Sequence, residues 1–247
     1  MSKIWKPVLA GTIIIIIGVI VLVIGLGLNG WEYGSAEQYQ MQTATLSGDY
    51  TALEVDIGVG DVAIYYDESV TELTVEYPTS KHLVAELSES GNRAKFVSKR
   101  EWIFFSVDFS GLPKTIVRLP VGKTVDLTVK LSAGQIKADG EFGKVTIDMS
   151  AGQFLSDNLV CSSFNFDLSA GAARVKRLVS DKIYFDVSAG SINVDVDGLK
   201  SDYTISVDKS AGSCNVGNQT GADKSKLIDI DISAGSVTLG FLEYQNQ

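Results

Sequence analysis

The tripeptide Ser-Ala-Gly occurs six times in the second half of this 247-residue chain. The steps between successive copies are 18, 19, 19, 22 and 23 residues, and a degenerate copy, Gly58-Val59-Gly60, comes earlier. Self-similarity at such a period is typical of a solenoid, in which each repeat adds one layer to a shared core. The glycines of the six copies are Gly134, Gly152, Gly171, Gly190, Gly212 and Gly235.

Apolar and polar residues alternate on both sides of each tripeptide. The positions one, three and five residues before the serine are apolar in every copy, with Lys209 as the one exception. A period of two indicates a β-strand with one buried face. The alternation changes parity across the glycine, and glycine can adopt backbone angles closed to other residues. We therefore expect the glycine to form a corner of each layer, with the small alanine before it pointing inward.

The repeat predicts an all-β domain, a right-handed parallel β-solenoid (a β-helix or β-roll) built from rungs of 18–23 residues. A β-sandwich is the alternative, but it does not explain the same tripeptide in consecutive units. Residues 126–247 hold the regular Ser-Ala-Gly rungs. Residues 46–125 are expected to be irregular rungs or a cap, since an open terminal strand invites pairing with another chain.

The N-terminus differs in composition from the rest of the chain. Val8–Leu28 is a run of 21 uncharged residues. At about 1.5 Å per residue, a helix of this length matches a hydrocarbon core of roughly 30 Å. Lys3 and Lys6 precede it, and no Lys or Arg follows before Lys81. The positive-inside rule therefore predicts a transmembrane helix over residues 8–28 with residues 1–7 in the cytoplasm.

This topology places a linker, residues 29–45, and the solenoid domain, residues 46–247, outside the cell membrane. A cleaved signal peptide is the alternative, because Gly34-Ser35-Ala36 could serve as a cleavage site. The apolar run is longer than the usual 7–15-residue core of a signal peptide, which favours a retained single-span anchor.

Charge and cysteine content restrict the possible partners. Without Lys3 and Lys6 the chain carries 19 basic and 30 acidic residues, a net charge of −11. Nucleic acids and anionic headgroups require basic patches, so neither is expected as a partner. Two cysteines, Cys161 and Cys214, are too few for a disulfide framework. Three rungs at about 4.8 Å each would hold them beyond the roughly 7 Å limit for bridged Cα atoms.

An acidic row stands two residues before the serine, where the alternation points side chains outward. Stacked rungs would place these carboxylates side by side, which suggests a calcium-binding ladder because hard cations take carboxylate oxygens. The alternative is that each aspartate accepts hydrogen bonds from its own turn or from a neighbouring hydroxyl, so that no metal is bound. The row consists of Asp148, Asp167, Asp186, Asp208 and Asp231.

No residue pattern indicates catalysis or a cofactor. The repeat serines form six equivalent copies, whereas catalysis needs one singular site with a base and an orienting group. The single histidine, His82, has no evident partner in the sequence. A β-helix enzyme acting on polysaccharides remains the enzymatic alternative, since an acidic solenoid face can hold catalytic calcium. The sequence predicts a protein that is not an enzyme.

One segment is rich in aromatic residues. Trp102, Phe104 and Phe105 lie close together in the irregular part of the domain. Such a cluster forms either a core or cap strand or an exposed patch that contacts a partner.

Three segments carry a family resemblance: Leu131-Ser132-Ala133-Gly134-Gln135-Ile136, Val187-Ser188-Ala189-Gly190-Ser191-Ile192 and Val117-Arg118-Leu119-Pro120-Val121-Gly122. With their copies they make residues 50–240 similar to the bacterial putative-adhesin family of unknown function, a β-strand repeat domain. The resemblance implies a membrane-tethered, extracytoplasmic bacterial protein, often met in envelope-stress contexts. Fold-level analogy does not establish function, and the family has no catalytic residues to carry over.

We therefore expect a membrane-anchored binding or scaffold module of the cell envelope, without catalysis or cofactor. In the first hypothesis it contacts an envelope polymer or another cell's surface. In the second it is a regulatory or sensor subunit that partners another membrane protein in an envelope stress response.

Overall fold

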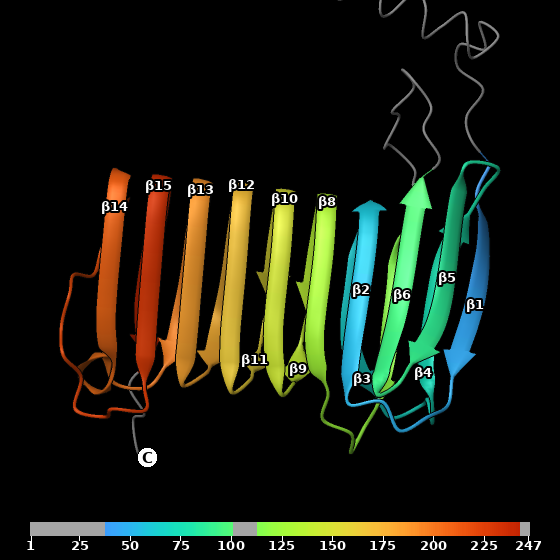
Figure 1. Cartoon of the computed structure of the whole chain (residues 1–247), viewed down its shortest axis with the longest axis horizontal. Helices are drawn as coiled ribbons and strands as arrows, with labels where there is room; N and C mark the ends of the chain where they lie inside the picture. The colour runs from blue at the N-terminus through green and yellow to red at the C-terminus, as the bar shows by residue number, and fades with distance from the viewer. Residues whose placement is uncertain (1–37, 101–112, 243–247) are drawn as a thin grey trace, which may run out of the picture.

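The computed structural model describes residues 38–100 and 113–242. The expected transmembrane segment, residues 8–28, lies outside the described residues, as do the linker residues up to 37. Within the described ranges, no helix is both long and apolar enough to cross a membrane. The described chain is a stack of β-strands side by side along one long axis (Figure 1), so the all-β prediction is confirmed.

Six long strands form the regular part of the stack, and all of them are parallel. Their pairing is in register, so that the glycine of each tripeptide lies beside the glycine of the next rung. The strands are β8 (Asp126–Ala138), β10 (Lys144–Ser156), β12 (Ser163–Val179), β13 (Lys182–Asp197), β14 (Thr204–Cys214) and β15 (Leu227–Leu242). Two short strands, β9 (Gly140–Glu141) and β11 (Leu159–Val160), pair in parallel with each other, and β11 also pairs with the end of β12.

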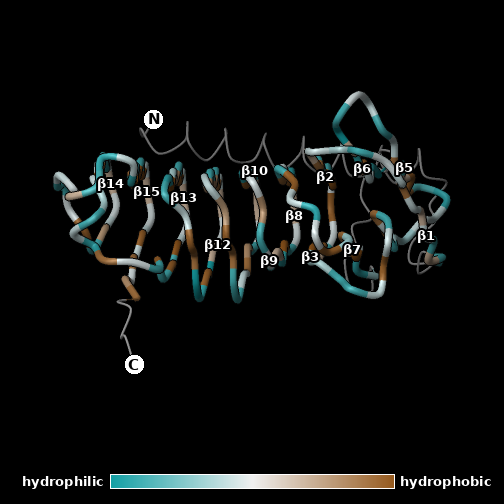
Figure 2. The backbone as a smooth tube through the Cα atoms, turned by 90° about the horizontal axis from the view of Figure 1, so that it is seen from below, coloured by the Kyte–Doolittle hydropathy of each residue, from teal (hydrophilic) through white to brown (hydrophobic). Residues whose placement is uncertain are grey.

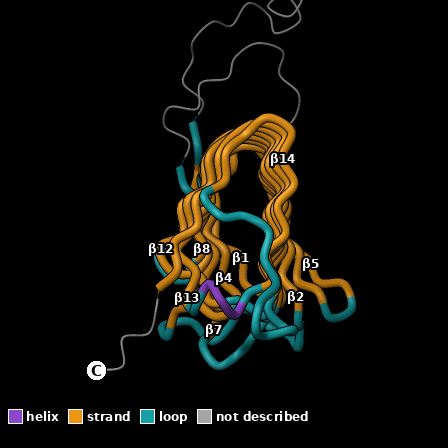
Figure 3. The backbone as a smooth tube through the Cα atoms, turned by 90° about the vertical axis from the view of Figure 1, so that its left-hand side faces the viewer, coloured by secondary structure: helices purple, strands orange, loops and turns teal. Residues whose placement is uncertain are grey.

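Each long strand runs along one wall, over an arch, and back along a second wall (Figure 3). The residues before the glycine form the first wall and those after it form the second. On β8, Leu127–Leu131 pair with β2 (Ala52–Val59), whereas Ile136–Ala138 pair with β3 (Val62–Asp67). The degenerate copy at Gly60 is therefore the arch of a rung.

The N-terminal end adds one further rung and an antiparallel cap. Strands β6 (Arg93–Arg100) and β7 (Thr115–Pro120) pair in parallel with β2 and β3. Antiparallel strands then extend both walls at this edge. Strand β5 (Leu83–Ser90) pairs with β6, β4 (Leu73–Thr79) pairs with β7, and β1 (Gln40–Leu46) pairs with β4. Residues 46–125 thus contain both irregular rungs and a cap.

At the C-terminal end the order in space differs from the order in the chain. Strand β15 lies between β13 and β14, although β14 precedes it in the sequence. A short 3-10 helix, η1 (Lys200–Asp202), leads outward to β14, and the connection 215–226 leads back to β15. The extra residues of the last two repeats make this excursion possible. Strand β14 is therefore the terminal rung.

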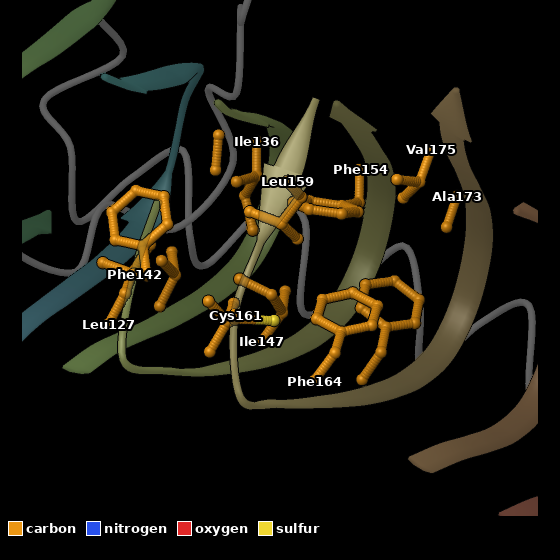
Figure 4. Close-up of a cluster of buried hydrophobic side chains, with 14 of the residues drawn as sticks. Leu127, Ile136, Phe142, Ile147, Phe154, Leu159, Cys161, Phe164, Ala173 and Val175 are labelled. Atoms are coloured by element: carbon orange, nitrogen blue, oxygen red, sulfur yellow. The ribbon is translucent and has the colours of Figure 1, made fainter. Parts of the chain in front are cut away.

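Inward side chains from the two walls meet in one continuous core. Phe154 of the second wall lies 5.4 Å from Phe166 and 5.9 Å from Phe164 of the first wall, measured between ring centroids. Figure 4 shows Phe154 and Phe164 in this core, together with Ile136, Ile147 and Leu159. Figure 2 shows hydrophobic stretches within the stacked strands and hydrophilic turns below β12. The core consists mainly of close-packed aliphatic and aromatic side chains.

The arch glycines have backbone angles that only glycine adopts without strain. Gly134, Gly152, Gly171 and Gly235 have φ between 136° and 148°, and a Cβ on any one of them would overlap the carbonyl oxygen of the glycine beside it. Gly212, on the terminal rung, has no such φ. The expectation that the alanine points inward is wrong, because both serine and alanine lie on the convex side of the arch. The exposed alanines are Ala151, Ala170, Ala189, Ala211 and Ala234.

Candidate binding face

The acidic row lies on the outer surface of the first wall. In spatial order its members are Asp148, Asp167, Asp186, Asp231 and Asp208. Each pairs in register with the next, and all five are exposed. The strand alternation that buries Ile147 and Met149 of β10 turns Asp148 outward between them. The same reasoning applies to every rung, so the fold itself builds a single file of carboxylates.

A shallow groove of about 370 Å³ runs along this row. One bank is formed by the aspartates of β10, β12, β13 and β15. The other bank carries the residues two positions earlier on the same strands, Thr146, Asn165, Tyr184 and Asp229. Tyr184 pairs in register with Asn165 on one side and Asp229 on the other, which places a half-buried aromatic ring within the acidic groove.

The charge of this row is not neutralised by the described part of the chain. No hydrogen bond or ion pair joins the five carboxylates to another described residue. Burial raises the pKa of Asp167 above its usual value, and the negative charges of Asp186 and Asp148 raise it further. The face thus holds like charges close together, which favours a partner that brings positive charge.

The same column changes sign toward the N-terminal end. Lys130 of β8 takes the place of the aspartate, and on β2 the column holds Asp56, which lies 3.8 Å from Lys99. Glu54 is almost fully buried beside three cations, with Arg93 at 2.9 Å, Lys95 at 3.1 Å and Lys130 at 3.6 Å. The acidic groups at this end are paired with cations, so the unpaired carboxylates of this column are those on β10, β12, β13, β15 and β14.

These cations determine how Glu54 ionises. Burial alone would raise the pKa of Glu54, but hydrogen bonds from Lys95 and Arg93 outweigh it, and the net pKa lies below the usual value. This cluster could not be predicted from the sequence, since Glu54 and Arg93 are 39 residues apart and no repeat spacing links them. Asp229 was not predicted either, although it stands in the column four residues before each serine.

The calcium ladder lacks a converging set of ligands. Within the described residues, no group of three or more His, Cys, Asp or Glu side chains is placed to hold a metal ion. Calcium takes six to eight oxygens around one centre, whereas this row presents carboxylates in single file. Calcium binding by the row stays a prediction that no observation supports.

The remaining candidate residues do not assemble into a site. Across the described ranges, no repeat serine is hydrogen-bonded to an acidic or basic side chain, and the backbone N–H of His82 bonds only locally, to the Ser80 hydroxyl. Cys161 is buried and Cys214 half-buried, and both thiols are free. The aromatic cluster of Trp102, Phe104 and Phe105 lies outside the described residues.

Residues 50–245 match the Toastrack DUF4097 family, which is most of the chain. The chain belongs to this family. The expected resemblance to a domain of unknown function with β-strand repeats is thereby confirmed. No curated protein matches the chain.

Solved structures similar to this Toastrack chain come from species of Clostridium, Bacteroides and Parabacteroides. One is described as a putative cell adhesion protein from Clostridium sporogenes; it is 14% identical, with a TM-score of 0.46, and the match covers 83% of this chain and 100% of that one. A putative adhesin from Bacteroides fragilis is 10% identical, with a TM-score of 0.39 and coverage of 83% and 98%. A putative adhesin from Parabacteroides merdae is 12% identical, with a TM-score of 0.31 and coverage of 81% and 96%.

Proposed function

We propose that this protein is a non-enzymatic binding module of the bacterial cell envelope that contacts an amine-bearing envelope polymer. The observation that carries the proposal is the row of uncompensated carboxylates along a groove that contains Tyr184. Protonated amines pair with carboxylates, and a cation or a sugar face packs against an aromatic ring.

The sequence supports an extracytoplasmic, membrane-anchored position for this module. The uncharged run Val8–Leu28 has the length of a single span, and the lysines precede it. An N-terminal anchor would hold the stack outside the membrane, where envelope polymers lie. A rigid stack suits this role because its carboxylates keep a fixed spacing.

A repeating face suits a repeating ligand. An exposed ion pair contributes only about 0.2–1 kcal/mol, so no single aspartate would hold a polymer firmly. Several equivalent carboxylates can bind successive amines of one chain, and each later contact then forms at a high effective concentration. Binding should therefore weaken steeply as salt is added, since exposed charges are screened.

The test uses the full chain in detergent, immobilised for a binding measurement. Chitosan oligomers supply a glycan with free amines, and the same oligomers after N-acetylation supply the neutral control. The variant with Asp148→Asn, Asp167→Asn and Asp186→Asn removes three charges from the groove. The matched control removes three charges from exposed positions elsewhere: Glu68→Gln, Glu86→Gln and Glu141→Gln.

We expect the wild type and the control variant to bind chitosan, and the groove variant to lose at least tenfold in affinity. Tyr184→Ser should weaken binding with no change in net charge. Equal binding by the groove variant, or equal binding to acetylated oligomers, would overturn the proposal. A lysine-rich peptide is a second ligand for the same measurement. Binding to this peptide without binding to chitosan would overturn the proposal of an envelope polymer and would favour a polypeptide partner, as in the regulatory hypothesis.

A further inference from the structure

The terminal rung leaves a strand edge open. Strand β14 pairs with β15 on one side only. On the other side, the described contacts are an antiparallel bridge between Ile205 and Gln219 and a 2.6 Å hydrogen bond from the Val207 N–H to Asn218 Oδ1. The connection 215–226 thus covers the first part of the edge. From Lys209 to the end of β14, no described strand pairs with the edge that faces away from β15.

The position of Lys209 is apolar in each of the other five Ser-Ala-Gly rungs. Lys209 pairs in register with Ile232 of β15, in the column directly before the serine. Lys209 is exposed, and its ammonium group has no hydrogen bond or ion pair within the described residues. The residues that fill this column in the other rungs are no more than 2% exposed: Leu131, Met149, Leu168, Val187 and Ile232.

A further rung stacked on β14 would cover this lysine. Its ammonium group would then lie between the two walls with no acidic partner from β14 or β15, and burying an unpaired charge is strongly unfavourable. Charged residues at inward positions of edge strands are a known means of preventing edge-to-edge pairing. The other inward residues of β14, Ile205, Val207 and Cys214, are apolar and present no such obstacle.

We propose that Lys209 closes the C-terminal end of the stack against a second copy of this chain. A second copy is the fitting occupant because β14 carries the tripeptide and, apart from Lys209, the inward apolar columns of the other Ser-Ala-Gly rungs, so its edge matches a strand of the same pattern. Two such edges can pair antiparallel about a two-fold axis, which gives a closed dimer rather than a fibre. The terminal surface is thus an interface that a single charge keeps unused.

The experiment replaces that charge in the full chain purified in detergent. Sedimentation velocity over a wide concentration range should give the mass of one chain for the wild type. Lys209→Leu should double that mass as concentration rises, and Lys209→Glu, which keeps a charge at the end, should remain single. The matched control is Lys182→Leu, which removes an exposed lysine from β13 inside the stack.

Labelling of Cys214 locates the contact, because this half-buried thiol lies on β14 itself. It should become protected in the Lys209→Leu dimer and stay reactive in the control. A folded Lys209→Leu variant that remains single, a dimer that leaves Cys214 reactive, or a Lys182→Leu variant that associates equally would each overturn the proposal. If the leucine variant fails to fold, Lys209→Thr removes the same charge and introduces a residue that favours strands. The same mass and labelling results then support or overturn the proposal.

Discussion

At the scale of single residues, the arch glycine is the position the fold tolerates least. Gly171 has φ of 141°, and a Cβ there would overlap the carbonyl oxygen of Gly152. Gly171→Ala should therefore lower stability by about 2–4 kcal/mol, through backbone strain and displacement of the neighbouring rung. Gly217→Ala is the control, since its Cβ would meet nothing within 4 Å. Denaturant midpoints measure both, and equal midpoints would contradict the assignment of the arch.

The sequence predicted that this glycine forms a corner, but it did not predict that the alanine beside it faces outward. Alternation of apolar residues indicates which side chains face the core, and it located the buried columns. At the arch the alternation breaks, and two adjacent residues face outward on the convex side. A pattern of period two cannot show where within a break the parity changes, so the exposure of Ala170 and its equivalents could not be predicted from it.

At the scale of strands, the acidic row lowers stability at neutral pH. The pKa of Asp167 is raised in the folded state, so its stabilising contribution is complete below the unfolded-state pKa and is lost as pH rises through the folded-state pKa. Asp167→Asn should raise stability slightly at pH 7, because it removes a like-charge repulsion that solvent partly screens on this exposed face. The gain should vanish in acid, where the aspartate is protonated.

A second aspartate, Asp157, should change stability in the opposite direction when it is replaced, and it serves as the control. Asp157 accepts hydrogen bonds from Lys137 at 2.7 Å and Lys176 at 2.6 Å, which lower its pKa to about 2. Its contribution is present above the usual aspartate pKa and is lost as pH falls toward 2. Asp157→Asn should therefore lower the melting temperature at pH 7, measured by circular dichroism. A shift in the same direction for both variants would contradict this account of the row.

The order of the strands could not be predicted from the repeat. Equal spacing indicates that rungs stack, but it does not state which rung lies beside which. Strand β14 reaches the end of the stack because the segments flanking it are longer than in other repeats. The antiparallel strands β5 and β1 carry no tripeptide, so only the structure places them as a cap. The acidic face followed from the sequence, whereas the groove around Tyr184 required the register between four strands.

At the scale of the whole molecule, stability should decline from the middle of the stack toward its ends. In a solenoid each rung contacts only its neighbours, so an interior rung is held on two sides and a terminal rung on one. Strand β14 has a single strand partner and an exposed half, whereas β12 pairs with both β10 and β13. Opening of β14 also leaves the core columns of β15 uncovered but does not disturb β10, because β15, β13 and β12 lie between β14 and β10.

Hydrogen exchange of the full chain, followed by mass spectrometry, measures this gradient. Amides of β10, β12 and β13 should exchange slowest, and those of β14, β1 and β5 should exchange first, because local opening costs least where fewest contacts are lost. Lys209→Leu should slow exchange over the second half of β14 once the dimer forms, and should leave β1 unchanged. If β14 exchanged as slowly as β12 in the wild-type single chain, the terminal rung would already be covered, and both the end position of β14 and the role of Lys209 would be wrong.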